Sequence, residues 1–386
     1  MSFKEASLRS VARVVTAAER RIRTLSSGTP QSILILEYLL PLGCCVHLTP
    51  VYEAIKRSDP DAVVSVATRG LGISLLRHHR FIDHLIETPD PFASPLSTAR
   101  SLRASLVHRA LDPDLIATGA SDRRFGIAAL AFSAWPAVRG GFTLYPELYH
   151  RPLQYDPSRS LIDNNLQLAE LAGASSEHRE PRVFFSTADL DKARAMAQSA
   201  HQQSRPLAIF VTQNSGGQRT GWYTARFAEV IRYAHYELGC EVAYVGTDKD
   251  SEPIAAIRKA ADGIGTSFAG RTSVTELAAL LCLSDVAVSL DTGTMHIGRA
   301  VGLPLVVLGP SWQAPIEWLP LGVPNVTILR GPDIDRRNIP EGYLLDEIDS
   351  PSVCAALHDL LRRYPPSESA RSERIAASIS SVDHLQ

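Results

Sequence analysis

Short apolar runs alternate along the chain with longer segments in which apolar residues recur every three or four positions. The short runs predict buried strands, because a strand covered on both faces reads as a continuous apolar stretch. The longer segments predict helices. The first half has predicted strands at 32–36, 62–67, 84–87 and within 106–117, and predicted helices at 49–57, 72–79, 125–133, 160–172 and 188–203.

The same alternation restarts after Ser204-Arg205-Pro206, a sequence that disfavours continuation of a helix. Strands that alternate with helices predict a parallel sheet. The fold class is therefore α/β, with two Rossmann-like doubly wound domains that face each other across a ligand-binding cleft. The second half has predicted strands at 207–212, 242–245, 285–290 and 305–308, and predicted helices near 225–238, 253–261 and 274–283 and from about Asp291.

Domain boundaries follow from these breaks, and the length of 386 residues agrees with two domains. Many serines and mixed charge predict a loose tail from Pro365 onward. We expect a basic helical extension over 1–30, a first domain over 31–204, a second domain over 205–348, and a C-terminal helix and tail over 349–386.

Composition and charge narrow the class of protein. The hydrophobic fraction of 45% and the charged fraction of 21% are those of an ordinary globular protein. The net charge of −2 shows no overall excess of basic residues that would attract phosphate groups, so no nucleic-acid partner is expected. The five cysteines lack CxxC spacing, and the chain shows neither a secretory signal nor an apolar run of about 18 residues. We therefore expect a cytoplasmic protein in a reducing compartment.

The segment from Lys4 to Leu25 combines apolar residues at helical spacing with five arginines. Such a helix could lie on an anionic surface, as a peripheral contact with the inner membrane. The alternative, which we favour because the apolar residues are small, is a leading helix packed against its own domain.

The most informative stretch is Asp291-Thr292-Gly293-Thr294-Met295-His296, which directly follows an apolar strand. An Asp or Thr at this point can cap a helix and leave its first backbone N–H groups free. Free N–H groups at a helix start bind phosphate, and a glycine lets a diphosphate approach closely. On the residues alone, a capped helix without a ligand is the alternative.

The stretch 291–296 is followed by Val301-Gly302-Leu303-Pro304, an apolar strand and Gly309-Pro310-Ser311. Together these strongly resemble the donor-site signature of the heptosyltransferase family, glycosyltransferase family 9, and the resemblance covers most of 207–322. It implies a glycosyltransferase of the GT-B type, with an acceptor-side first domain and a nucleotide-sugar-binding second domain. It also implies transfer from a nucleotide-diphospho-sugar, such as ADP-heptose, to a glycan or lipopolysaccharide-type acceptor, with inversion and with no metal or other cofactor.

Residues 213–222 lie between a strand and a helix, where the family has a loop that contacts the donor's phosphates. A glycine-rich turn can form an anion-binding concavity, although a flexible surface turn is equally consistent, and the stretch is not a P-loop. The family usually has a lysine at the position of Thr220, and Arg219 could replace it from one residue away. The predicted donor-binding residues are Thr212, Asn214, Ser215, Arg219, Asp291, Thr292, Gly293, Thr294, Met295 and His296.

In the first half, the spacing from Gly43 to Pro50 matches the family's acceptor-side loop. The family has an aspartate after this glycine, taken to be the general base, whereas this chain has Cys44. A thiol with an ordinary pKa of about 8.5 is mostly protonated at neutral pH, so Cys44 is an unpromising substitute. The candidate catalytic bases are instead His47 and Glu37, although His47 could simply pack at a helix start and Glu37 could be solvated.

Basic residues between 69 and 80 could face the cleft and hold an anionic acceptor, such as a phosphorylated core sugar, or could form a solvated helix face. We take Arg69 and Arg77 as acceptor-side residues, together with Gly43 and Cys44. Two other functions stay open. The chain could bind a nucleotide-sugar without catalysis, having lost the family's base at Cys44, or it could be a nucleotide-sugar epimerase on the same architecture.

Overall fold

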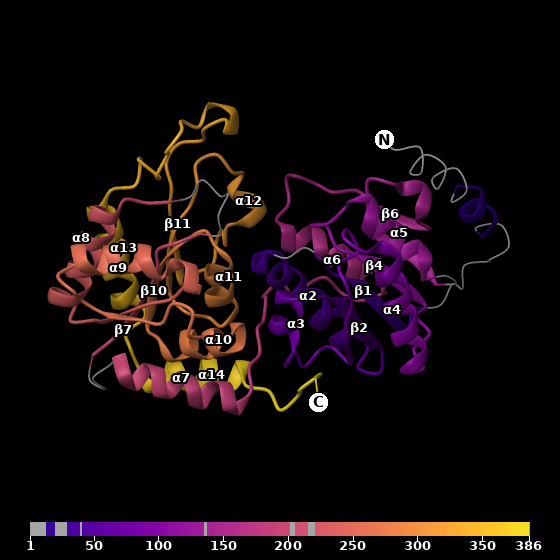
Figure 1. The fold of residues 1–386 in the computed structure, drawn as a ribbon, viewed down its shortest axis with the longest axis horizontal. Coiled ribbons are helices and arrows are strands. Elements are labelled where there is room, and N and C mark those ends of the chain that lie inside the picture. The colour runs from indigo at the N-terminus through magenta and orange to yellow at the C-terminus, as the bar shows by residue number, and fades with distance from the viewer. Residues whose placement is uncertain are drawn as a thin grey trace. The chain divides into compact units, whose positions relative to one another are not determined.

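The chain folds into two compact units, seen in a computed structural model that describes residues 13–19, 29–38, 41–134, 137–200, 205–214 and 221–385. One unit runs to Pro181 and takes in the chain end from Val382, and the other spans Arg182–Ser381. Each unit is built on its own six-stranded sheet (Figure 1).

The sheet of the first unit is parallel throughout, in the order β3-β2-β1-β4-β5-β6. Its order runs outward in both directions from β1, so the crossover helices cover both faces. The strands are β1 (Ser32–Leu36), β2 (Val63–Thr68), β3 (His84–Glu87), β4 (Leu115–Thr118), β5 (Val138–Phe142) and β6 (Arg151–Leu153). The helices are α2 (Leu42–Ser58), α3 (Leu71–Leu76), α4 (Pro95–His108), α5 (Phe125–Ser133) and α6 (Leu161–Leu171).

The sheet of the second unit is also parallel, in the order β12-β11-β10-β7-β8-β9. Its strands are β7 (Leu207–Val211), β8 (Glu241–Tyr244), β9 (Thr266–Ser267), β10 (Val286–Leu290), β11 (Leu305–Leu308) and β12 (Val326–Leu329). Its helices are α7 (Thr187–Ala200), α8 (Thr224–Tyr236), α9 (Ser251–Ala260), α10 (Val274–Leu283), α11 (Gly293–Ala300), α12 (Pro315–Trp318), α13 (Ser350–Arg363) and α14 (Glu368–Ser378).

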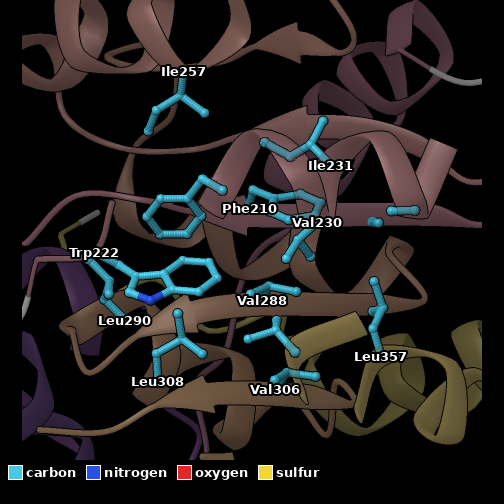
Figure 2. Close-up of a cluster of buried hydrophobic side chains, with 14 of the residues drawn as sticks. Phe210, Trp222, Val230, Ile231, Ile257, Val288, Leu290, Val306, Leu308 and Leu357 are labelled. Atoms are coloured by element: carbon cyan, nitrogen blue, oxygen red, sulfur yellow. The ribbon is translucent and has the colours of Figure 1, made fainter. Parts of the chain in front are cut away.

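The core of the second unit lies between the sheet and helices α8, α9 and α13. Alternate residues of β10 point to the same face, so Val288 and Leu290 both enter this core. Figure 2 shows them with Phe210 of β7, Val230 of α8 and Leu357 of α13. This packing holds the carboxyl ends of β7, β10 and β11 rigidly beside one another.

Helix α2 begins at Leu42, well before the start near Thr49 that the sequence predicts. The structure thus places Pro50 in the helix interior, where proline is disfavoured because it lacks the backbone N–H. Pro50 has no N–H to offer the Val46 carbonyl, but the Thr49 hydroxyl donates to that carbonyl at 2.8 Å. The side chain thus replaces the missing backbone bond, and the helix passes through the proline.

The division between the units differs from the predicted boundary after residue 204. Helix α7 lies in the second unit, where it packs against α10. Lys192 of α7 forms an ion pair with Glu276 of α10 at 2.6 Å. The break at Ser204-Arg205-Pro206 follows α7, so it separates two elements of one unit.

The C-terminal region also differs from the predicted loose tail, because residues 368–378 form helix α14. Arg371 of this helix donates to both carboxylate oxygens of the buried Asp285, at 2.9 and 3.1 Å. Beyond α14 the chain returns to the first unit, where Asp383 binds Arg77.

The described part of the predicted N-terminal extension comprises residues 13–19, 29 and 30, of which 13–19 are helical. Thr16 is buried and Glu19 accepts a hydrogen bond at 2.7 Å from Arg139, a fully buried arginine of β5. This short helix therefore packs on the first unit, and the rest of the Lys4 to Leu25 segment lies outside the described residues. None of the helices in the described ranges has the length and hydropathy of a membrane-spanning segment.

Candidate functional site

The candidate donor site is built at the carboxyl ends of neighbouring strands in the second unit. Strand β10 lies between β7 and β11, with Ser289 in register with Val211 on one side and Val307 on the other. The residues that follow these strands therefore gather at one edge of the sheet, which is where open α/β sheets bind their ligands. They include Thr212 after β7 and the predicted stretch from Asp291 after β10.

Helix α11 starts at this edge without a side-chain cap. Its N-cap residue, Thr292, is extended, with φ −145° and ψ 169°, and its side chain makes no capping hydrogen bond. The Thr292 hydroxyl oxygen is buried and makes no hydrogen bond within the described part of the chain. The first backbone N–H groups of α11 and this hydroxyl are thus available to an anion, which the partial positive charge of the helix start would attract.

Asp291 and His296 contact each other from either side of this helix start. Both are buried, with 8% and 3% of their surface exposed, and His296 Nε2 lies 3.6 Å from Asp291 Oδ1. Met295 is completely buried. Thr292, Gly293 and Thr294 are half-buried, so these three can touch a ligand, whereas Asp291, Met295 and His296 shape the turn from inside.

A cavity of about 480 Å³ opens beside the end of β7. Two predicted donor residues, Thr212 and Asn214, line it, whereas Ser215 and Arg219 lie outside the described residues, as does Thr220. The other lining residues are Gln213, Gly221, Trp222, Tyr223, Thr224, Ala225, Pro253, Ala256, Ile257 and Leu344. This mixture of apolar surface and a few polar groups suits a flat heterocycle with polar edges.

The wall of this cavity includes residues that the sequence does not single out. The Trp222 indole N–H donates to the Ile348 carbonyl at 2.9 Å, and Arg226 donates to the same carbonyl at 2.6 Å. Tyr223 donates to Asp346. These bonds attach the start of α8 to residues 346–348, more than a hundred residues later, which no local pattern signals. They also leave Trp222 only 5% exposed, so it holds the loop in place.

The loop after β11 is held by Arg330, another residue that the sequence does not single out. Its guanidinium donates to the carbonyl oxygens of Pro310, Ser311 and Gln313, at 3.4, 3.2 and 3.3 Å. An ion pair with Asp333 at 2.7 Å completes this arrangement. The Gly309-Pro310-Ser311 part of the signature is thus positioned from a residue that follows β12.

In the first unit, Glu37 directly follows β1 at the carboxyl end of the sheet, and only 2% of its surface is exposed. A Cβ atom on Gly119 would lie 3.4 Å from Glu37 Oε2, so this carboxylate lies beside the turn after β4. Burial, followed by the negative charge of Glu37, raises the pKa values of Cys45 and Tyr52 well above their usual ranges.

His47 and Cys44 lie on α2 and are also buried, with 2% and 1% of their surface exposed, and Gly43 is buried with them. Asn165 of α6 donates to the His47 carbonyl at 3.2 Å and accepts from the Ala120 N–H at 2.9 Å. The residues from Gly43 to Pro50, predicted as the acceptor-side loop, are helical and belong to α2. They lie next to the turn after β4, close to Glu37.

The predicted acceptor-side arginines already have carboxylate partners. Arg69 forms an ion pair with Asp90 at 2.8 Å, and Arg77 binds Asp383 through two hydrogen bonds of 2.8 and 2.6 Å. An anionic acceptor would have to compete with these carboxylates. In the described ranges, no three His, Cys, Asp or Glu side chains are grouped so that they could hold a metal ion.

Two parallel doubly wound units in one chain are the architecture of the GT-B fold. The chain belongs to glycosyltransferase family 9 (heptosyltransferase), whose family model matches residues 139–332. Both the fold class and the family resemblance that the sequence suggests are thereby confirmed.

Known proteins resemble most of the chain. Lipopolysaccharide heptosyltransferase 3 of Escherichia coli is 25% identical over 337 residues, which cover 83% of this chain and 96% of the relative. A family 9 glycosyltransferase of Veillonella parvula has the same fold, with a TM-score of 0.76 and 18% identity over 86% of this chain and 97% of its own. The E. coli ADP-heptose lps heptosyltransferase II matches with a TM-score of 0.71 and 19% identity over 86% and 99% of the two chains.

Proposed function

We propose that this glycosyltransferase transfers heptose from ADP-heptose to a lipopolysaccharide-type acceptor, with inversion and without a metal ion. The observation that carries the proposal is the uncapped start of α11, where the Thr292 hydroxyl and the first backbone N–H groups can receive a diphosphate. The names of the relatives supply the sugar, the nucleotide and the acceptor class.

In this mechanism the diphosphate is the leaving group, and it gains negative charge as the bond to the sugar breaks. The backbone N–H groups of Gly293 and Thr294 would stabilise that charge, because they are fixed before the reaction starts. The cavity beside Thr212 and Asn214 would hold the adenine, with the apolar side chains of Ile257 and Leu344 against the ring.

Glu37 is our candidate for the base that takes the proton from the acceptor hydroxyl. At its reference pKa a carboxylate is ionised at neutral pH, whereas a thiol at its reference pKa is mostly protonated. Glu37 also lies at the carboxyl end of the central strand β1. His47 is the second candidate, because a neutral imidazole can also accept a proton.

Nucleotide titration by calorimetry tests the donor site. We expect ADP to bind more tightly than UDP or GDP, and we expect Asp291→Ala and Gly293→Val to weaken ADP binding at least tenfold. Arg219→Ala tests the loop that lies outside the described residues. Asp359→Ala, a change to an exposed carboxylate on α13, is the control and should bind ADP normally. Absence of binding to any of the three nucleotides would refute the donor site.

Transfer assays with Glu37→Gln and His47→Gln test the base. Loss of general-base catalysis costs about a hundredfold or more in rate. We expect Glu37→Gln to lose transfer by that amount while binding ADP as tightly as the unchanged chain. If only His47→Gln has this effect, the base is His47.

The presence of Cys44, where the family has an aspartate, favours one other candidate function. In this function the protein binds a nucleotide-sugar but does not catalyse transfer. It predicts that the unchanged chain binds ADP but neither hydrolyses ADP-heptose nor transfers heptose to lipopolysaccharide acceptors. Transfer by the unchanged chain would exclude it.

Because the proposed acceptor is a glycolipid, we also propose that the chain contacts the inner membrane surface peripherally.

A further inference from the structure

One face of the first unit's sheet is covered by α4, α5 and the helical residues 13–19 (Figure 1). Leu36 and Ile116 of the sheet pack with buried residues of α4 and α5 in a single cluster. Arg139 is in register with Ile116, so it points to the same face, and its guanidinium stacks on Phe132 of α5. Since Arg139 also binds Glu19, residues 13–19 belong to this layer.

The outer side of α4 exposes apolar and cationic residues together. Leu96 and Val107 are 73% and 74% exposed, and Arg100 and Arg103 between them are exposed as well. The spacings of four, three and four residues place all four side chains on one side of the helix, along roughly 16 Å. We call these four residues the α4 stripe. Leu102 and Leu106 occupy the opposite side of the helix and are buried.

This layer carries almost no negative charge. No aspartate or glutamate occurs between Asp90 and Asp112, and α5 has no charged residue. The acidic residue of the segment 13–19 is Glu19, which is mostly buried and bound to Arg139 and His150. Asp90 is bound to Arg69.

The cationic side chains of the layer, in contrast, are open to solvent. Arg100, Arg103 and Arg109 are exposed and form no ion pair with any carboxylate of the described residues, and Arg13 and His108 are exposed nearby in the layer. The whole chain has a net charge of −2, so this positive surface is a local feature.

We infer that the α4 stripe is a docking surface for an anionic lipid bilayer. Arginines attract the negative surface of phosphatidylglycerol or other acidic lipids, and their apolar stems can stay in the interface with the heads in the polar region. Leu96 and Val107 can then enter the boundary between head groups and acyl chains, as the apolar side of an interfacial helix does.

A nucleic acid fits this surface less well. Phosphate backbones bind arginines equally, but they offer nothing to two exposed aliphatic side chains, and the stripe has no aromatic residue on which bases could stack. This inference rests on the proposed function, because it names the surface through which the chain would contact the membrane. That surface is α4, whereas the sequence suggests the N-terminal segment Lys4 to Leu25.

Vesicle flotation of the full chain tests the proposal without donor or acceptor. We expect flotation with phosphatidylcholine vesicles that contain phosphatidylglycerol, little with phosphatidylcholine alone, and release by high salt. The double variant Arg100→Glu with Arg103→Glu should weaken partitioning at least thirtyfold, because each arginine near an anionic surface contributes about fivefold and each glutamate adds repulsion. Leu96→Ser with Val107→Ser should weaken the part of the binding that resists salt.

The matched control is Arg194→Glu with Lys259→Glu, which makes the same charge change at exposed helical positions of the second unit. It should bind vesicles normally. ADP titration of every variant separates this proposal from the proposed function, because the stripe variants should bind ADP normally whether or not they bind lipid. Normal vesicle binding by both stripe variants would overturn the proposal. A second result would also overturn it. This is that the unchanged chain does not bind vesicles but binds duplex DNA, and that the double variant Arg100→Glu with Arg103→Glu loses this DNA binding.

Discussion

Four of the five cysteines, Cys45, Cys240, Cys282 and Cys354, are placed where a thiolate is disfavoured. Cys44, Cys45, Cys240 and Cys282 are buried, and Cys354 is partly exposed. Burial raises the pKa values of Cys240 and Cys282 to about 12 and that of Cys354 to about 11. For Cys45, burial and then the charge of Glu37 act in the same direction. Because alkylating agents react with the thiolate, these thiols should be inert in the folded protein.

We therefore predict that iodoacetamide at neutral pH leaves Cys45, Cys240 and Cys282 unmodified in the native chain and modifies all five cysteines in urea. Mass spectrometry after proteolysis reads out each site. Rapid native alkylation of Cys45 would contradict the buried placement of the first turns of α2, and with it the close approach of Glu37.

At the scale of single elements, helix α2 depends on a side chain to pass through its proline. The Thr49 hydroxyl donates to the Val46 carbonyl, which Pro50 leaves without its usual backbone donor. We predict that Thr49→Val, which keeps the shape of the side chain, lowers the free energy of unfolding by about 1 kcal/mol. Urea denaturation measures it. In a Pro50→Ala background, where the backbone N–H is restored, the same change should cost less.

Helix α14 is attached to the rest of the second unit through the buried carboxylate of Asp285. Asp285 accepts from the Leu207 N–H at 2.8 Å as well as from Arg371, and it directly precedes β10, the strand that leads to Asp291. Removing one partner leaves the other charge buried and uncompensated.

We predict that Arg371→Met destabilises the second unit by about 3 kcal/mol. Adding Asp285→Asn should recover part of this loss, since the amide keeps an acceptor for Leu207 and carries no charge. Arg362→Met is the control, because its partner Asp359 is exposed, and it should cost less than about 1 kcal/mol in thermal or urea unfolding. Equal losses in Arg371→Met and in the double variant would argue against a charge effect.

At the scale of the whole molecule, the chain end belongs to the unit in which the chain begins. Asp383 binds Arg77 through two hydrogen bonds, and the carbonyl of Val382 lies 2.7 Å from His78 Nδ1. The hydrogen bonds from Arg77 lower the pKa of Asp383 to about 2. Its pKa in the unfolded chain is near the ordinary value of about 3.9. The contribution of this pair to stability is thus complete above about pH 4 and is lost as the pH falls through about 2.

Asp383→Asn should therefore lower the unfolding midpoint in urea at pH 7, and the gap to the unchanged chain should narrow as the pH falls below 4. Arg77→Gln should give the same pH dependence. A gap that stays constant down to the lowest pH at which the protein folds would show that the pair does not act through the charge of Asp383.

Several features could be predicted from local sequence because their physical cause is local. Strands β1 and β10 lie within one residue of their predicted positions, since a strand buried on both faces is apolar along most of its length. The helix start after Asp291 was also predictable from Asp291, Thr292 and Gly293 next to the strand, although the side-chain cap that these residue types favour is not formed. Ser215 and Arg219 stay predictions, as do the roles of Glu37 and His47.

The sequence by itself therefore determined the α/β class, the family and the location of the helix start that would bind the donor. The tertiary structure decided what depends on residues far apart in the chain. It paired Arg77 with Asp383, joined α14 to Asp285 and placed α7 in the second unit. Such pairings depend on which helices and strands come into contact when the two cores pack. The local pattern of apolar residues does not predict these contacts.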